Sequence, residues 1–154
     1  MITIMSNLLV NKKATLNYTL VDTYQTGLQL YGLEVKSLRK KHGSLVGSFV
    51  VQKDGELWLK GAYIPPYQPN NTPESYDPYR LRKLLLKKSE LKKITMSRKG
   101  EGLTLIPIKL YNSNRFLKLE IALARGKKKH DKREALKKHD TDRDLGRTLK
   151  NRSK

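Results

Sequence analysis

The chain of 154 residues contains no cysteine, which excludes disulfide bonds and thiol catalysis. It also has no apolar run close to the roughly 20 residues that a membrane-spanning helix requires. The first ten residues lack the basic segment and continuous apolar core of a signal peptide, because Thr3, Ser6 and Asn7 interrupt them. These absences predict a soluble, cytoplasmic protein.

Motifs for the common cofactor and metal sites are missing as well. There is no Walker loop, and no Gly-x-Gly-x-x-Gly turn between a strand and a helix. Three histidines occur, His42, His130 and His139, and none has the spacing of a metal site. No nucleophile, base and stabilising donor can be assembled from the other residues. We therefore expect no enzymatic activity, no cofactor and no metal.

Acidic residues are too few to balance the basic ones. The 33 Lys and Arg against 14 Asp and Glu give a formal net charge of +19. Residues 125–154 contain 13 of the basic and 5 of the acidic residues, so the preceding 124 residues are basic in their own right. Self-repulsion at this charge lowers stability, and a polyanionic partner would relieve it. Nucleic acid is the first candidate partner, and an anionic membrane surface is the second.

The last thirty residues almost lack large apolar side chains, since only Leu136, Leu145 and Leu149 remain. Such a segment cannot bury enough surface to offset its ordering entropy, so we expect residues 125–154 to be disordered in the free protein. Its acidic and basic residues lie three or four positions apart, which supports a helix once the segment is bound. Gly146 weakens that helix by about 1 kcal/mol relative to alanine.

Residues rich in Tyr, Thr and Val predict strands over much of the chain before this tail. We expect strands at 16–33, 103–111 and 116–124, and a hairpin over 48–64. The Asp54-Gly55 pair in that hairpin favours a type I′ turn. Residues 112–114 are expected to form the turn between the last two strands.

Helical patterns are shorter and fewer. Residues 33–38 predict a short helix that ends at Gly43, and residues 79–99 predict the main helix, which Ser89 can cap. Residues 1–13 are interpreted as a leader, and the proline-rich stretch 65–78 as a long loop.

This order of elements indicates a mainly β protein rather than alternating βαβ units. We predict a small closed OB-like β-barrel of five or six strands with two or three short helices, over residues 1–124. The basic tail, 125–154, follows it.

The positive charge of the barrel is gathered in three clusters, at Lys12-Lys13, Lys36–Lys41 and Arg80–Lys88. Tyrosines are interleaved with these clusters, and small β-barrels bind nucleic acids through such a mixture of cations and aromatic rings. Core packing is the better interpretation for Tyr18, Tyr24 and Tyr111, which fall on strand patterns. A run of charged residues is usually just a solvent-exposed face. Here, however, the three clusters and the tail are all positively charged, and this favours RNA binding.

Several sequence motifs resemble one known family in order along nearly the whole chain. The most specific are Glu34-Val35-Lys36-Ser37-Leu38 and Gly126–Arg133. The other matching pieces are Asn11–Ala14, Leu20–Tyr24, Gly27-Leu28, Ser48–Val50, Gly55-Glu56, Arg82–Leu86, Leu110-Tyr111 and Ile121–Arg125. The chain thus resembles the SsrA-binding protein, or small protein B, family of bacterial trans-translation.

This resemblance implies an OB-like barrel that binds the tRNA-like domain of transfer-messenger RNA and delivers that RNA to stalled ribosomes. The stalled chain then receives a degradation tag, and the ribosome is released. The tail would enter the small-subunit decoding centre and the empty mRNA channel, and become helical there. The elongation factor that delivers aminoacyl-tRNA is a further candidate partner. We expect a monomer that has no membrane partner.

The resemblance also assigns residues to the two surfaces. The RNA-binding face would comprise Asn11, Lys12, Lys13, Gly27, Glu34, Lys36, Arg39, Arg80, Arg82, Lys83, Leu85 and Lys87. The tail residues that contact the ribosome would be Lys127, Lys128, Lys129, His130, Asp131, Lys132, Arg133, Lys137, Lys138, Arg143 and Arg147.

Three of these residues have two interpretations. Glu34 would accept hydrogen bonds from a base or ribose, or form a salt bridge with Lys36 or Arg39. Leu85 would pack against a nucleotide or belong to the core. His130 would stack on a base or be a solvated tail residue. Gln25, Thr141 and Thr148 depart from residues that some family members have at these positions.

Without the resemblance, the leading alternative is a ribosomal protein that binds ribosomal RNA permanently through an OB-like body and a basic extension. A single-stranded DNA-binding OB protein is the next alternative. An enzyme is the least favoured.

Overall fold

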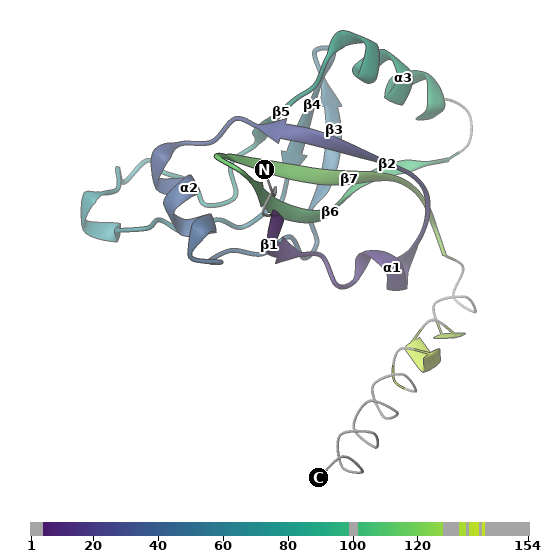
Figure 1. Cartoon of the computed structure of the whole chain (residues 1–154), viewed down its shortest axis with the longest axis horizontal. Helices are drawn as coiled ribbons and strands as arrows, with labels where there is room; N and C mark the ends of the chain where they lie inside the picture. Colours follow the sequence, from purple (N-terminus) through teal and green to yellow (C-terminus); the bar gives the residue numbers. More distant parts are fainter. Residues whose placement is uncertain (1–4, 99–101, 128–132, 135, 139, 141–154) are drawn as a thin grey trace.

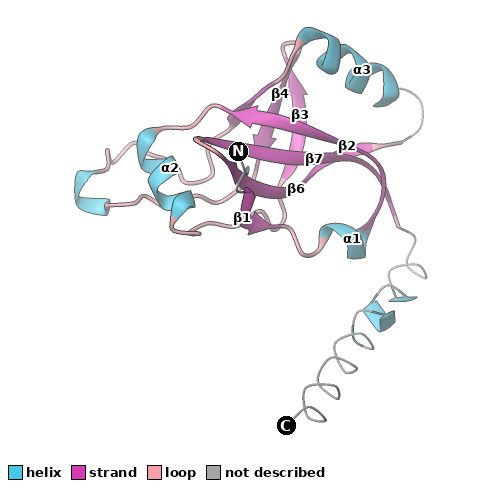
Figure 2. Cartoon of the chain, viewed as in Figure 1, coloured by secondary structure: helices cyan, strands magenta, loops and turns pink. Residues whose placement is uncertain are grey.

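The computed structural model describes residues 5–98, 102–127, 133–134, 136–138 and 140. In these ranges the chain forms a seven-stranded antiparallel sheet that curves into a barrel, with short helices at its periphery (Figures 1 and 2). The strands are β1 (Met5–Val10), β2 (Tyr18–Leu28), β3 (Phe49–Lys53), β4 (Glu56–Lys60), β5 (Arg82–Leu85), β6 (Thr104–Ser113) and β7 (Phe116–Gly126).

The sheet closes because β6 and β7 pair with each other as well as with their other neighbours. The strand order is β1-β6-β3-β4-β5-β2-β7, and the additional β6–β7 pairing completes a ring of six strands. Strand β1 lies outside this ring, where it pairs with residues 109–113 of β6. The predicted OB-like barrel is confirmed, and closure leaves few unpaired edges.

The core fills the inside of this ring with aliphatic side chains that alternate along the strands. Leu117, Leu119, Ile121 and Leu123 of β7 are buried, whereas Phe116 and Lys118 are exposed. Such period-two alternation places one face of a strand on the core and the other outside. The outer face of β7 is therefore available for function near its start.

The helices close or flank the barrel (Figure 2). Helix α2 (Gly32–Arg39) contributes Leu38 to the main core, and α3 (Lys88–Arg98) contributes Ile94. Helix α1 (Ala14–Asn17) packs Ala14 on the outer face of β6 and β7, in a second apolar cluster. A short 3-10 helix, η1 (Pro69–Asn71), interrupts the expected loop over 65–78.

The β3–β4 hairpin agrees with the sequence prediction. Asp54 and Gly55 have φ angles of 53° and 75°, the two positive values that a type I′ turn requires. The short helix at 33–38 also forms, as α2, although its C-cap is Lys40 rather than Gly43.

Three further local predictions were wrong. Residues 1–13 are not all leader, because Met5–Val10 is strand β1. The segment 79–99 is not one helix, since its first part forms β5 and the helix begins at Lys88. Strand β6 extends through Ser113, so the turn before β7 consists of Asn114 and Arg115. Strand β5 was missed because Arg82 occupies a buried position in it. Arginine is mostly found on protein surfaces, so the sequence of β5 does not show the alternation of buried apolar and exposed polar residues that predicts a strand.

Strand β7 ends at Gly126, so the first two residues of the predicted tail, Arg125 and Gly126, belong to the barrel. Arg133, Glu134, Leu136–Lys138 and Asp140 have helical backbone, and all other residues after Lys127 lie outside the described residues. The expected disorder of the free tail therefore stays a prediction. Among the described residues, we find no helix with the length and apolarity needed to cross a membrane.

Candidate nucleic-acid interface

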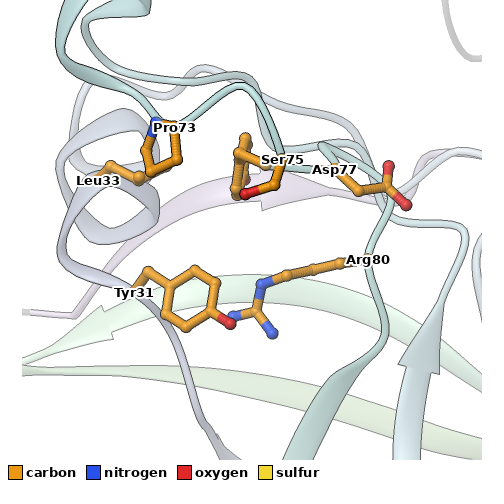
Figure 3. Close-up of a pocket in the computed structure, with 7 residues that line it drawn as sticks. Tyr31, Leu33, Pro73, Ser75, Asp77 and Arg80 are labelled. Atoms are coloured by element: carbon orange, nitrogen blue, oxygen red, sulfur yellow. The ribbon is translucent and has the colours of Figure 1, made fainter.

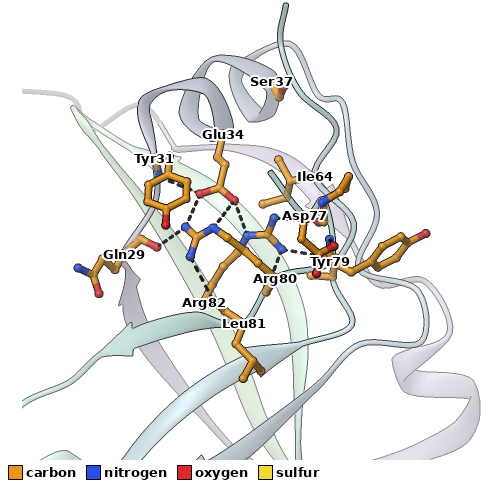
Figure 4. Close-up of polar contacts among 12 residues, drawn as sticks. Gln29, Tyr31, Glu34, Ser37, Ile64, Asp77, Tyr79, Arg80, Leu81 and Arg82 are labelled. Carbon is orange, nitrogen blue, oxygen red and sulfur yellow. Dashed lines mark hydrogen bonds and ion pairs between the residues drawn. The ribbon is translucent and has the colours of Figure 1, made fainter. Parts of the chain in front are cut away.

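A buried ion cluster joins α2 to Arg80 and to the first residue of β5, Arg82 (Figure 4). The Glu34 carboxylate, which is fully buried, accepts hydrogen bonds from Arg80, from Arg82 Nε at 2.7 Å and from the Tyr31 N–H at 2.7 Å. The Tyr76 hydroxyl donates to the same carboxylate at 3.1 Å. One carboxylate thus holds two guanidinium groups, whose geometry suits paired hydrogen bonds.

Arg82 uses every N–H group of its guanidinium inside the protein. Besides Glu34, its acceptors are the carbonyls of Ala62 (2.8 Å), Pro78 (2.9 Å) and Arg80 (3.2 Å) and the Tyr76 hydroxyl (3.3 Å). An arginine is stable in such a position only when all its donors are satisfied. The cluster therefore fixes the 65–81 loop against the barrel.

The pKa of Glu34 reflects two opposing effects. Burial alone would raise the pKa, but the hydrogen bonds from Arg80 and the Tyr31 N–H, with the charge of Arg82, lower it below its ordinary value. The carboxylate is thus ionised at neutral pH, as the paired arginines require.

The side chains of Glu34 and Arg82 have no exposed surface in this structure. The RNA contacts expected of these two residues stay a prediction. The expected salt bridge of Glu34 with Lys36 or Arg39 was wrong, because its partners are Arg80 and Arg82. Spacing in the sequence suggested that Glu34 pairs with a basic residue of its own helix. The fold instead brings Arg80 and the start of β5 next to its carboxylate.

On the outer face of the barrel, the strand registers place four residues in one cross-strand row. Three of them reach the surface, and the fourth, Tyr111, is buried. Gly27 of β2 pairs with Leu85 of β5 on one side and with Lys118 of β7 on the other. Lys118 pairs in turn with Tyr111 of β6. We call these four residues the outer row. Leu85 is 51% exposed, so its expected burial in the core is excluded.

Gly27 keeps the outer row flat at its centre. A Cβ atom at this position would lie 3.1 Å from Leu85 Cβ, closer than side chains ordinarily approach. The absence of a side chain at Gly27 therefore makes room for the Leu85 side chain, which lies against this position.

Sequence reasoning missed the parts of this face that come from β6 and β7. Lys118 was recognised only as part of a strand, although its exposed position follows from the alternation with Leu117 and Leu119. Tyr111 is buried, as expected for a core residue, and its hydroxyl donates a hydrogen bond to Gln25 Oε1. Burial, with the charge of Glu120, raises the pKa of Tyr111. Only strand register could bring Gln25 and Tyr111 together.

Helix α1 brings the first basic cluster to the edge of the same barrel face. Asn11 donates through Nδ2 to the Pro107 carbonyl (2.9 Å), at a bulge of β6, and Lys12 and Lys13 are exposed. Lys127 lies beside this helix, since its N–H donates to Asn17 O (2.9 Å) and its Nζ to Thr15 O (2.7 Å). The root of the tail is therefore attached to α1.

The remaining predicted barrel residues lie around the rim. Lys36 and Arg39 are exposed on α2, and Arg39 donates to the Arg115 carbonyl of the β6–β7 turn (3.2 Å). Lys83 lies 3.9 Å from Glu56, and Lys87 is exposed immediately before α3. Of the two arginines in the buried cluster, only Arg80 is partly exposed, with 20% of its side-chain surface accessible.

The predicted tail residues are only partly described. Arg133, Lys137 and Lys138 are exposed, and Lys127 is half-buried. Lys128, Lys129, His130, Asp131, Lys132, Arg143 and Arg147 lie outside the described residues. In the described part of the chain, no three His, Cys, Asp or Glu side chains lie close enough to hold a metal ion.

Comparisons with known proteins find one family. The model of the SmpB protein family matches residues 8–151, which include the barrel and most of the tail. A protein of Bartonella henselae named SsrA-binding protein is 49% identical over 141 residues, 91% of this chain and 89% of that protein. The SsrA-binding protein of Streptococcus mutans is 45% identical over 140 residues, 91% of this chain and 90% of the relative.

A solved structure gives a corresponding match. It is described as "tmRNA-SmpB: a journey to the center of the bacterial ribosome", and one of its chains superposes with a TM-score of 0.64 at 39% sequence identity. The match covers 87% of this chain and 94% of that chain.

Proposed function

The chain belongs to the SmpB family, and on this premise we propose that it binds transfer-messenger RNA and takes it to stalled ribosomes for trans-translation. The observation that carries this proposal is the family match over residues 8–151. The match includes both the barrel with its outer row and the basic tail. The solved relative, a protein of a tmRNA-SmpB and ribosome study, supports the same two partners.

The barrel is the part that holds the RNA. The outer row places the exposed apolar side chain of Leu85 and the cation of Lys118 on either side of Gly27. Lys12 and Lys13 extend the positive charge at the edge of this face. Cations attract the phosphates, and exposed apolar groups pack on unstacked bases, which is how OB-like barrels bind structured RNA.

The tail is the part that enters the ribosome. Its net positive charge is complementary to the phosphates that line an mRNA channel, and this attraction offsets the entropy that the tail loses when it becomes ordered. The bonds from Lys127 to α1 fix where the tail leaves the barrel. The tail occupies the decoding centre and the empty channel only when no mRNA fills them.

Delivery takes place in the cytoplasm, with the protein bound as a monomer. The elongation factor that carries aminoacyl-tRNA accompanies the complex, because the RNA presents a tRNA-like domain. The protein acts by binding and not by catalysis, so it has no substrate to turn over.

Purification of the full chain from its native cell, followed by sequencing of the RNA that accompanies it, tests this function. We expect one small stable RNA with a tRNA-like end, and release of the protein from ribosomes washed at high salt. A protein that remains on salt-washed ribosomes without that RNA would instead be a ribosomal protein. Preferential binding of random single strands over a folded tRNA-like RNA would indicate a single-strand binder.

A further inference from the structure

A cavity of 540 Å³ opens between the N-terminus of α2 and the 65–81 loop (Figure 3). One wall consists of Tyr31 and Arg80, and another of the apolar side chains of Leu33 and Pro73. A volume of this size suits one small planar group. Arg80 is the one expected RNA-binding residue that lines this cavity, and no residue of the outer row lines it.

The Tyr31–Arg80 wall is a rigid flat surface. The Arg80 guanidinium lies 3.9 Å from the centre of the Tyr31 ring. It cannot easily move away, because it also binds Glu34 and donates to the carbonyls of Leu81 (3.1 Å) and Gln29 (3.3 Å). Tyr31 is nevertheless 56% exposed. Unstacked bases stack on exposed aromatic rings, and an arginine beside the ring adds a cation–π contribution.

The polar groups of the cavity suit a base better than a phosphate. Ser75 and Asp77 line its rim, and Asp77 accepts a hydrogen bond from the Tyr79 N–H (2.9 Å). A carboxylate repels phosphate but accepts hydrogen bonds from the amino groups of adenine, cytosine or guanine. Lys36 lies in the adjoining hollow, which shares Leu33 as a wall, and can neutralise a phosphate outside the cavity.

The cavity continues the outer face of the barrel. Along β2 and the residues after it, Gln25, Gln29 and Tyr31 are exposed, whereas the intervening Thr26 and Leu28 are buried. Arg80 donates to the Gln29 carbonyl, so the cavity wall is bonded to the chain that extends the outer row. An RNA strand on that row would reach Tyr31 without leaving the surface.

We propose that this cavity binds one unstacked nucleobase of the bound RNA, with Tyr31 as the stacking surface. The inference rests on the proposed function and names an additional RNA contact for it. The base enters between Tyr31 and the Leu33–Pro73 wall, and its phosphate stays outside near Lys36.

Two variants of Tyr31 and one matched control test the proposal. Tyr31→Ala removes the ring, and Tyr31→Phe keeps it. Tyr79→Ala is the control, because Tyr79 is 57% exposed and packs against Tyr63 without lining the cavity. The probe is a transcript of the tRNA-like domain of transfer-messenger RNA. We expect about 5- to 30-fold weaker binding for Tyr31→Ala and unchanged binding for the other two variants, since one stacked base contributes at this level.

Cross-linking by ultraviolet light identifies the contact in the unaltered chain, so it does not depend on how Tyr31→Ala folds. Mass spectrometry should find a nucleotide attached to Tyr31 after irradiation with the transcript or with small ribosomal subunits. The sample in which the adduct forms identifies which RNA supplies the base. No adduct in either arm, together with unchanged affinity of Tyr31→Ala, would overturn the cavity assignment. An unaltered chain that does not bind the transcript would contradict the proposed function itself.

Discussion

At the scale of single residues, the buried cluster of Glu34, Arg80 and Arg82 determines how the loop before β5 lies on the barrel. Two guanidinium groups share one carboxylate, and Arg82 has no exposed surface. Such an arrangement is stable only while the carboxylate is present, because a buried charge without a partner is strongly unfavourable. The cluster therefore positions Tyr31 and the 65–81 loop against the barrel.

Replacement of Glu34 by glutamine should therefore destabilise the protein by about 3–5 kcal/mol, since it leaves Arg80 and Arg82 without a counter-charge. Urea unfolding followed by circular dichroism measures the change. Glu56→Gln is the matched control, because Glu56 and Lys83 are partly exposed and 3.9 Å apart. Its cost should stay below about 1 kcal/mol. Equal effects of the two substitutions would contradict the structural role of Glu34.

The same carboxylate should make stability depend on pH. Folding lowers the pKa of Glu34 from its ordinary value of 4.5. The stability that it contributes is therefore complete above this pH and is lost as the pH falls through the lower pKa of the folded protein. The difference in unfolding free energy between the unaltered chain and Glu34→Gln should shrink in acid. A difference that stays constant from neutral pH to about pH 3 would disagree with this account.

At the scale of elements, the pairing of β5, β2, β7 and β6 assembles a surface from residues far apart in the sequence. The row of Leu85, Gly27, Lys118 and Tyr111 exists only because each strand has its particular register. A shift of one residue in β7 would turn Lys118 into the core. The bulges in β2 and β6 fall beyond this row, so they do not disturb it.

Lys118 should contribute one phosphate contact to RNA binding. We expect Lys118→Ala to weaken binding of the tRNA-like transcript and to reduce the slope of log Kd against log salt by about 1. Titrations at several salt concentrations give this slope. Lys53→Ala is the matched control, because Lys53 is exposed in β3, which takes no part in the row. A slope that Lys118→Ala leaves unchanged would remove Lys118 from the interface.

At the scale of the whole molecule, the barrel and the tail are expected to have separate tasks that meet at α1. The last strand ends at Gly126, and Lys127 is the residue that bonds to α1. A truncation should therefore be made after Lys127, so that these bonds are kept. The truncated chain should bind transfer-messenger RNA with unchanged affinity and fail to tag stalled nascent chains.

Gel-shift titration and an in vitro tagging assay measure these two activities. The control for the tail is a full-length chain in which Thr141 and Thr148 are replaced by alanine, which keeps the length and charge of the tail. It should retain both activities. Loss of RNA binding together with tagging in the truncated chain would contradict the division between barrel and tail.

The sequence by itself determined the class of fold, the β3–β4 hairpin and the basic character of both parts. These features follow from local properties: strand-forming residues, the Asp54-Gly55 turn and the count of charges. Its motifs also pointed to the family. Local pattern could not reveal β1 or β5, because β1 is defined by its pairing with β6 and β5 contains a buried arginine.

Only the tertiary structure decided which of the predicted residues are exposed and which are buried. Glu34 and Arg82 became buried partners, and Leu85 became an exposed neighbour of Gly27. The cavity beside Tyr31 likewise needs the 65–81 loop to fold back on α2. Burial, strand register and the partner of a charge are relations between distant segments, and the chain acquires them only when the barrel closes.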